Sequence, residues 1–91
     1  MIFVIEYHIE VVKHDIPNLP KKVKKRIKKA IEEKLVTSPE VFGKPLRRSL
    51  KGYRKLRVGD YRIIFKIQKN KVKIFIIQHR SVVYTNTNRT K

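Results

Sequence analysis

The stretch GYRKLRVGDYRIIFKI, residues 52–67, consists of two runs of strand-forming residues joined by the turn Gly59-Asp60. Hydrophobic and polar side chains alternate along both runs, and such alternation around a glycine-containing turn is typical of a β-hairpin. We therefore predict strands at residues 53–58 and 61–67. The hairpin also concentrates positive charge that it does not need in order to fold. These cations are Arg54, Lys55, Arg57 and Arg62.

A third run of strand-forming residues, 72–79, follows the turn Lys69-Asn70, so the three runs predict an antiparallel meander. The second and third runs carry hydrophobic residues on both faces. We expect one face of the sheet to pack on helices while the other stays partly open. Strict alternation places Ile63, Phe65 and Ile67 opposite Ile64, and Val72, Ile74 and Ile76 opposite Phe75 and Ile77.

The N-terminal half predicts one strand and two helices. Residues 3–7 form a strand-like run, and hydrophobic residues at positions 9, 12 and 16 have helical spacing up to Pro17. A longer amphipathic helix is expected to have Pro20 in its first helical position and to end at Ser38-Pro39. The hydrophobic stripe of this helix consists of Val23, Ile27, Ala30, Ile31 and Leu35.

Together these elements predict a single α+β domain covering residues 1–91, with one sheet packed on the helices. Residues 40–52 read as an irregular basic connection. The polar residues 85–91 are expected to form a flexible tail, too short and too polar for a C-terminal helix.

The charge is strongly asymmetric along the chain. The net charge is +17. Residues 41–91 contain fifteen Lys or Arg and one acid, Asp60, whereas residues 1–40 contain nine Lys or Arg and six Asp or Glu. This excess makes a polyanion, and nucleic acid first, the expected partner. Heat adaptation would raise Glu together with Lys, which is not the pattern here. The lysines of the longer helix are read as a solvated face.

Several kinds of site are excluded by composition. The chain has no cysteine, so disulfides, thiolate nucleophiles and cysteine-containing zinc sites are absent. Its three histidines fall on separate predicted elements with few acids nearby, so we expect no metal and no cofactor. The sequence shows no signal peptide, and no apolar run approaches the roughly 18 residues of a membrane span. We expect a cytoplasmic protein without a membrane partner.

The period of a strand determines which charges of the hairpin lie together. Leu56 and Val58 are expected to face the core, so Tyr53, Lys55 and Arg57 share the open face of the first strand. This cluster is large enough to hold a phosphate, and Tyr53 offers a stacking surface.

Further polar residues follow the third strand, which ends in His79 and Arg80 and is followed by Tyr84. We expect the end of the third strand to lie near the start of the first, so that these groups meet Tyr53 and Lys55. The face on which Arg62 lies depends on the strand register, which the sequence does not give.

Two motifs resemble a known family. The pattern L-x-G-Y-R-K-L-R-V-G-D-Y-R-I-I-F at residues 50–65 and the pattern I-F-I-I-Q-H-R-S-V-V-Y at residues 74–84 resemble the RelE/ParE superfamily of toxins, and the RelE branch most closely. The resemblance covers nearly the whole chain. It implies an mRNA interferase that enters the ribosomal A site and cleaves the message without metal, by attack of a ribose 2'-hydroxyl on the adjacent phosphate. It also implies an acidic, RelB-like antitoxin that holds the toxin inactive in a hetero-oligomer.

The resemblance implies a catalytic set and leaves a wider RNA-binding set around it. The implied catalytic residues are Lys55, Arg62, Arg80 and Tyr84. The candidate RNA-binding residues are Tyr53, Arg54, Arg57, His79, Arg47, Arg48 and Lys51. One departure from the family is Tyr53, which stands where some members have a second lysine.

Cleavage through a 2'-hydroxyl needs a base, an acid, and cations that stabilise the charge building on the phosphorus centre. Arginine suits the last task because its guanidinium can bind two phosphate oxygens, so Arg62 and Arg80 are candidates for it. Our hypothesis from the sequence is that the neighbouring cations both attract RNA and make Lys55 a better base. Tyr84 is a candidate to orient the 2'-hydroxyl or exchange a proton. His79 is a second proton-transfer candidate, although we favour a structural role for it.

Two other functions remain open from the sequence. A ParE-like toxin that poisons DNA gyrase would act by protein binding and would not need the cationic set on the sheet. A non-catalytic RNA-binding module would use the same cations only to hold phosphates.

Overall fold

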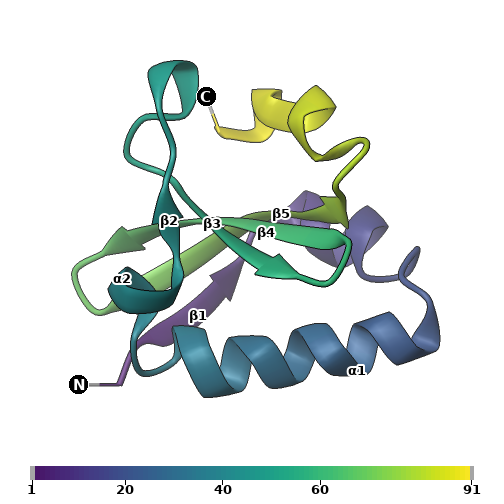
Figure 1. Ribbon diagram of the computed structural model, residues 1–91, viewed down its shortest axis with the longest axis horizontal. Helices are drawn as coiled ribbons and strands as arrows, with labels where there is room; N and C mark the ends of the chain where they lie inside the picture. Colours follow the sequence, from purple (N-terminus) through teal and green to yellow (C-terminus); the bar gives the residue numbers. More distant parts are fainter. Residues whose placement is uncertain (1, 91) are drawn as a thin grey trace.

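The computed structural model describes residues 2–90, without the side chains of residues 86–88 and 90. Its centre is one sheet with the strand order β1-β5-β4-β3-β2 (Figure 1). β3 (Arg54–Val58), β4 (Tyr61–Gln68) and β5 (Lys71–His79) form the predicted antiparallel meander. β1 (Val4–Tyr7) runs parallel to β5, and the two-residue strand β2 (Lys44–Pro45) runs antiparallel to β3. The predicted α+β class is confirmed, with two more strands in the sheet than the meander alone.

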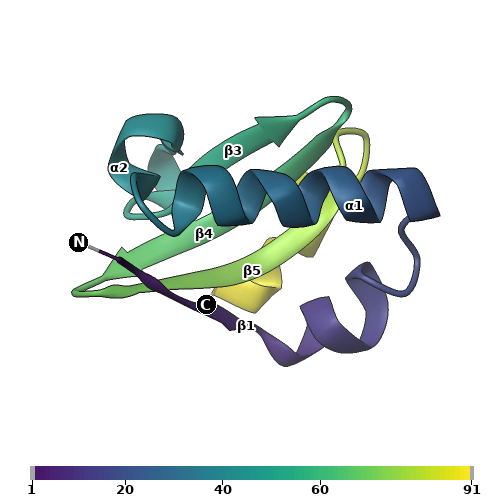
Figure 2. The ribbon, with the colours of Figure 1, turned by 90° about the horizontal axis from the view of Figure 1, so that it is seen from below.

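The two helices that the sequence predicts before the meander are both present. The first is a π-helical segment, η1 (Val11–Asp15). The second is α1 (Lys21–Ala30), which continues as the π-helical turn η2 (Ile31–Leu35) and crosses one face of the sheet (Figure 2). Pro20 was predicted in the first helical position, but it is the N-cap of α1, one residue before the first helical residue, Lys21. The Pro20 carbonyl accepts a hydrogen bond from the Lys24 N–H at 2.9 Å.

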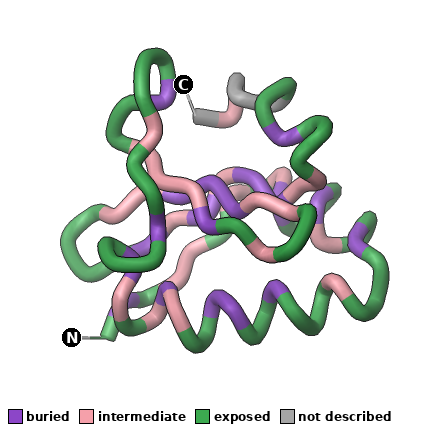
Figure 3. Tube along the Cα trace, in the orientation of Figure 1, coloured by how far each residue is buried: buried purple, intermediate pink, exposed green. Residues whose placement is uncertain are grey.

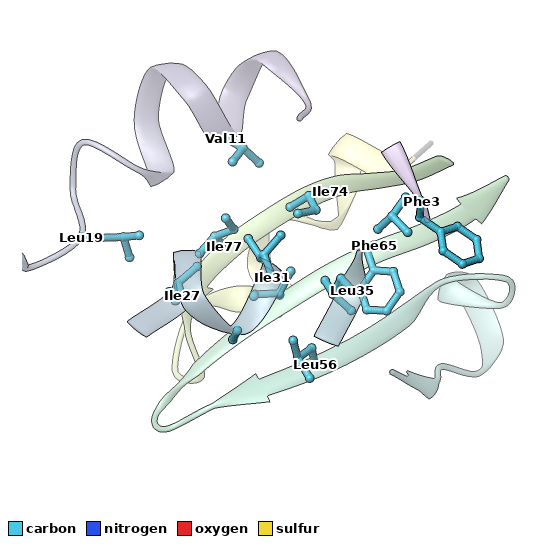
Figure 4. Packing of buried hydrophobic residues seen from close by; sticks show 13 residues of the cluster. Phe3, Val11, Leu19, Ile27, Ile31, Leu35, Leu56, Phe65, Ile74 and Ile77 are labelled. Carbon is cyan, nitrogen blue, oxygen red and sulfur yellow. The ribbon is translucent and has the colours of Figure 1, made fainter. Parts of the chain in front are cut away.

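The main core lies between these helices and the sheet. Figure 3 shows buried residues along the strands and along the side of α1 that faces them. The predicted stripe of the long helix packs there against Leu56, Ile63, Phe65 and Ile74 (Figure 4). A second, smaller cluster lies on the other face of the sheet and consists of Ile64, Ile76 and Val83, with Leu46, Tyr53 and Phe75 packed against it.

A β-bulge changes the faces of β5. Ile64 is opposite Ile76 but the next residue, Phe65, is opposite Ile74, so β5 contains one extra residue at this point. The bulge reverses the alternation beyond it, which places Ile77 in the main core and Ile76 in the second cluster. The prediction that Ile76 shares a face with Val72 and Ile74 is therefore wrong.

Two segments have more structure than the sequence predicts. The connection 40–52 was expected to be irregular, but it contains β2, the 3₁₀ turn η3 (Arg48–Leu50) and most of the short helix α2 (Pro39–Phe42). The tail forms a 3₁₀ helix, η4 (Val83–Thr90), so the expectation of no C-terminal helix is wrong for the described residues; Lys91 of that expected tail lies outside them. η4 lies on the side of the sheet opposite α1 (Figure 1). In the part of the chain that the structure describes, no helix is long and apolar enough to cross a bilayer.

Candidate active site

The strand register places three of the predicted cations on one face of the sheet. Arg57 is directly opposite Arg62, and Lys55 is opposite Ile64 of the second hydrophobic cluster. Because residues two apart on a strand share a face, Arg62 lies on the same face as Lys55 and Arg57. The strand register thus fixes the face of Arg62, and the three cations line one cleft of about 300 Å³.

Hydrogen bonds to the hairpin turn hold Arg62 in place. One terminal guanidinium nitrogen donates to the backbone carbonyls of Gly59 at 3.0 Å and of Tyr61 at 2.9 Å. A guanidinium has five N–H donors, so the groups on its other two nitrogens remain for a ligand in this geometry. The Arg62 side chain is half-buried, so it moves less than an exposed arginine. It therefore loses less conformational entropy when it binds a phosphate.

Arg80 lies at the same end of the sheet, in the turn after β5. Its backbone N–H donates to the carbonyl of Asp60 at 2.8 Å, and its Nε lies 3.8 Å from the Asp60 carboxylate. Both side chains are largely exposed, so this ion pair contributes little to stability and leaves Arg80 accessible to an anion.

The third strand does not meet the start of the first. His79 is opposite Tyr61, which in turn is opposite Val58 at the end of β3. β3 and β5 flank β4 and therefore run in the same direction, so their ends lie together and their starts lie together. The prediction that His79 and Arg80 meet the start of β3, at Tyr53 and Lys55, is wrong for this reason: they follow the end of β5, which lies beside the end of β3.

Tyr53 and His79 both make structural contacts. The Tyr53 ring packs edge-on against the Phe75 ring, with 5.2 Å between the ring centroids. The Lys66 ammonium lies 5.3 Å from the centroid of the Tyr53 ring. The His79 ring packs edge-on against Tyr61 at 5.4 Å, and its Nδ1 accepts a hydrogen bond from the backbone N–H of Ser81 at 3.2 Å.

The C-terminal segment brings Tyr84 to the face that carries the cations. Val83 is fully buried against Ile64 and Ile76, and Ile64 is opposite Lys55. The side chain that follows, Tyr84, is half-exposed on this segment. The hydrophobic contact of Val83 therefore anchors the C-terminal segment on the same face as Lys55, Arg57 and Arg62.

Arg54 lies apart from the cluster. It shares the face of Leu56, and its guanidinium donates to the backbone carbonyls of Gly43 at 2.9 Å and Glu40 at 3.2 Å. The other predicted RNA-binding residues, Arg47, Arg48 and Lys51, are exposed in the loop around η3. Figure 1 shows this loop rising on the same side of the sheet as η4.

Sequence reasoning missed three residues of the cleft. Lys34, Phe42 and Lys44 line it together with the cations of β3 and β4. Lys34 belongs to η2, for which the sequence predicts solvated lysines, and the other two fall in residues 40–52, for which it predicts an irregular connection. The signal that could have found the last two is the aromatic residue Phe42 in the basic stretch 41–59, which contains no acid. Among the described residues, no group of three His, Asp or Glu lies close enough to hold a metal.

Comparison with known proteins gives consistent matches over most of the chain. Residues 7–84 match the sequence model of the ParE toxin of type II toxin–antitoxin systems, parDE. Toxin RelE of Mycobacterium tuberculosis (strain ATCC 25618 / H37Rv) is 32% identical over 83 residues, 86% of each chain. A chain of the RelBE2 toxin–antitoxin complex from Mycobacterium tuberculosis has a TM-score of 0.81 at 27% identity, covering 88% of this chain and 100% of that one. A chain of the RelB–RelE complex from Methanococcus jannaschii has a TM-score of 0.69 at 26% identity, covering 88% and 95%.

Proposed function

This chain belongs to the ParE toxin family of type II toxin–antitoxin systems, and from this premise we propose that it is a ribosome-dependent endoribonuclease that cleaves mRNA in the A site. The observation that carries the proposal is the common face of Lys55, Arg57 and Arg62, with the segment of Tyr84 anchored on that face. Its substrate is a phosphodiester, because the described residues that line the cleft include five cations and no acid.

The proposed reaction breaks an RNA strand without a co-reactant. The 2'-oxygen of a ribose forms a bond to the adjacent phosphorus as its proton leaves to a base. The bond from phosphorus to the 5'-oxygen breaks, and that oxygen takes a proton from an acid. The products are a 2',3'-cyclic phosphate and a 5'-hydroxyl.

The residues divide this work by their chemistry. Arg62 and Arg80 stabilise the negative charge on the phosphorus oxygens in the transition state, and Arg62 is already held by the turn carbonyls. Lys55 and Tyr84 are the candidates for the two proton transfers and for orienting the 2'-hydroxyl. Arg57 holds a neighbouring phosphate.

The proposed partner is an acidic antitoxin, in keeping with the RelB and RelE chains of the similar complexes. A groove of about 360 Å³ between α1 and the turn that follows η1 offers a place for its apolar side chains; the lining includes Tyr7, Ile16, Leu19, Ile27, Ile31 and Ile77. Burial, and then the negative charge of Glu32, raise the pKa of the Tyr7 hydroxyl above its usual value, so it stays neutral there. The acidic part of the antitoxin would neutralise the cationic face.

A second function deserves a test because the matching family model is named for ParE. A toxin that poisons gyrase would bind protein and would arrest replication. The cationic face of β3 and β4 favours the nuclease, since gyrase binding gives no reason for three cations on one sheet face.

The deciding experiment is primer extension on an mRNA held by ribosomes, with EDTA present. Wild type is compared with Arg80→Ala and with Lys13→Ala, a loss of one exposed cation on η1. New ends in the A-site codon with wild type and Lys13→Ala, but not with Arg80→Ala, support the proposal. A folded wild type that binds ribosomes without cleavage supports the RNA-binding module, and arrest of replication without loss of translation supports the gyrase poison.

A further inference from the structure

The cleft beside the candidate catalytic residues extends to the open edge of β3. β4 pairs with one edge of β3 along its whole length, but on the other edge β2 pairs only with the first two residues of β3. Within the described residues no strand lies along this second edge from Leu56 onward. The space is bounded on this side by Lys34 of η2 and Phe42 of α2. A compartment is therefore available next to Lys55, between the sheet and the α2–β2 corner.

The lining of this compartment combines cations with one aromatic ring. Five of its seven residues are Lys or Arg, and the other two are Phe42 and Leu56. Phe42 is 44% exposed, although its side chain is large and apolar. The Lys34 ammonium lies 5.6 Å from the centroid of the ring and places positive charge beside it. A ligand that satisfies both features has a planar apolar part and an anionic part, which is the chemistry of a nucleotide.

The α2–β2 corner that presents Phe42 and Lys44 is held firmly. The Arg54 guanidinium donates to the backbone carbonyls of Glu40 and Gly43 and so ties the corner to β3. Gly43 is buried against the ring of Phe65, where a side chain would not fit. The aromatic ring and the ammonium on either side of Gly43 are thus presented from a fixed backbone, which lowers the entropy lost on binding.

We propose that Phe42 and Lys44 form a subsite for a nucleotide that flanks the scissile phosphate. The base stacks on Phe42, and its phosphate lies between Lys44 and Lys55, which are opposite each other in the β2–β3 pair. The inference rests on the proposed function in that RNA is the ligand. An extended peptide could instead pair with the open edge of β3. The exposed ring and the excess of cations favour the nucleotide, because strand pairing uses backbone groups and needs neither.

The first test measures binding without cleavage. A fluorescent 2'-O-methyl RNA hexamer cannot undergo 2'-hydroxyl attack, and its dissociation constant is measured by polarisation. Phe42→Ala is expected to weaken binding by roughly fivefold or more, and Phe42→Tyr by less than about twofold, because Tyr keeps the stacking face. The matched control is Val41→Ala, the exposed apolar neighbour, which should bind as wild type. Lys44→Gln should reduce the slope of log affinity against log salt by about 0.7.

The second test uses the base itself. Abasic hexamers, each lacking one base, are measured against wild type and Phe42→Ala. For one hexamer, loss of the base should weaken binding to wild type as much as the Phe42→Ala substitution weakens binding of the intact hexamer. The Phe42→Ala variant should bind this abasic hexamer and the intact hexamer with the same affinity. A purely structural role for Phe42 would not produce this loss of additivity.

The outcomes separate the subsite from the nuclease. The subsite is overturned if Phe42→Ala binds the hexamer as wild type does, if Phe42→Tyr fails to restore binding, or if Phe42→Ala loses affinity only for the antitoxin, which would assign the edge to a peptide. Hexamer binding with the expected dependence on Phe42, but no cleavage on ribosomes by wild type, would retain the subsite and reject the nuclease.

Discussion

Arg57 and Arg62 lie directly opposite each other in the antiparallel pair of β3 and β4. Like charges in opposite positions of two strands destabilise a sheet. The turn carbonyls of Gly59 and Tyr61 accept hydrogen bonds from Arg62 and offset part of this repulsion. The pair is therefore explained better by ligand binding than by folding.

Arg57→Thr should make the protein more stable and a weaker RNA binder. Removal of the like charge and the strand preference of Thr should raise the free energy of unfolding by roughly 0.2–1 kcal/mol. Loss of one phosphate contact should lower the salt slope of binding to single-stranded RNA by about 0.7. Urea denaturation and polarisation measure the two quantities, with Lys13→Thr as a control for charge. A less stable Arg57→Thr with unchanged binding would contradict this account of the pair.

Arg89→Met should release the C-terminal segment. The buried Asp15 carboxylate accepts hydrogen bonds from the Ile77 N–H and Gln78 Nε2, both at 2.9 Å, and from Arg89 at 2.6 Å. The first two donors remain in the variant, so the loss in unfolding free energy should be about 1.5–3 kcal/mol, as for one charged hydrogen bond. Urea denaturation tests this, and hydrogen exchange of the Thr85 amide, which bonds the Val82 carbonyl, should become faster.

The control for this change is Lys71→Met, which removes the ion pair of Lys71 with Glu6 at 3.7 Å. Both of these side chains are about half-exposed, so the loss should stay below about 1 kcal/mol. Equal effects of the two substitutions would show that Asp15 does not anchor the segment through Arg89.

Gly43→Ala should destabilise the α2–β2 corner. An added Cβ would collide with the ring of Phe65 and lie 2.9 Å from the carbonyl oxygen of Pro39. Phe65 is fully buried, so the strain should cost about 1–3 kcal/mol of unfolding free energy. Phe65→Leu shortens the side chain at the point of collision. The double variant should therefore be more stable than the sum of the two single effects predicts, and strict additivity in urea denaturation would argue against the collision.

Local sequence determined the meander well because alternation and turn residues act over short distances. Gly59 has a φ of 60° in the first turn, as a two-residue hairpin turn requires. The bulge of β5 could not be found in this way, because an unbroken hydrophobic run such as residues 74–77 has no polar residue that would mark the reversal. The strand β2 has two residues, one of them Pro45, and gives no local signal at all.

The site was predictable in its charges and less so in its arrangement. The face of Lys55 and Arg57 follows from the strand period, whereas the face of Arg62 required the register. The sequence-based prediction put the end of β5 near the start of β3, and this was an error of topology. Two strands that flank a common antiparallel neighbour run in the same direction, so the end of β5 lies near the end of β3. The contact of Asp15 with Arg89 joins residues 74 positions apart, which neither period nor motif can show.

Salt and the loss of an apolar contact should weaken the complex with the antitoxin in different ways. If acidic residues of the antitoxin cover the cationic face, the dissociation constant should rise with salt, and Arg57→Thr should reduce that dependence. Tyr7→Ala removes an apolar contact from the groove between α1 and the turn that follows η1, and it should speed dissociation with an unchanged salt slope. Surface plasmon resonance from low to high salt measures both. A complex whose affinity is the same throughout that range would show that the groove, and not neutralisation of Arg57 and its neighbours, holds the toxin inactive.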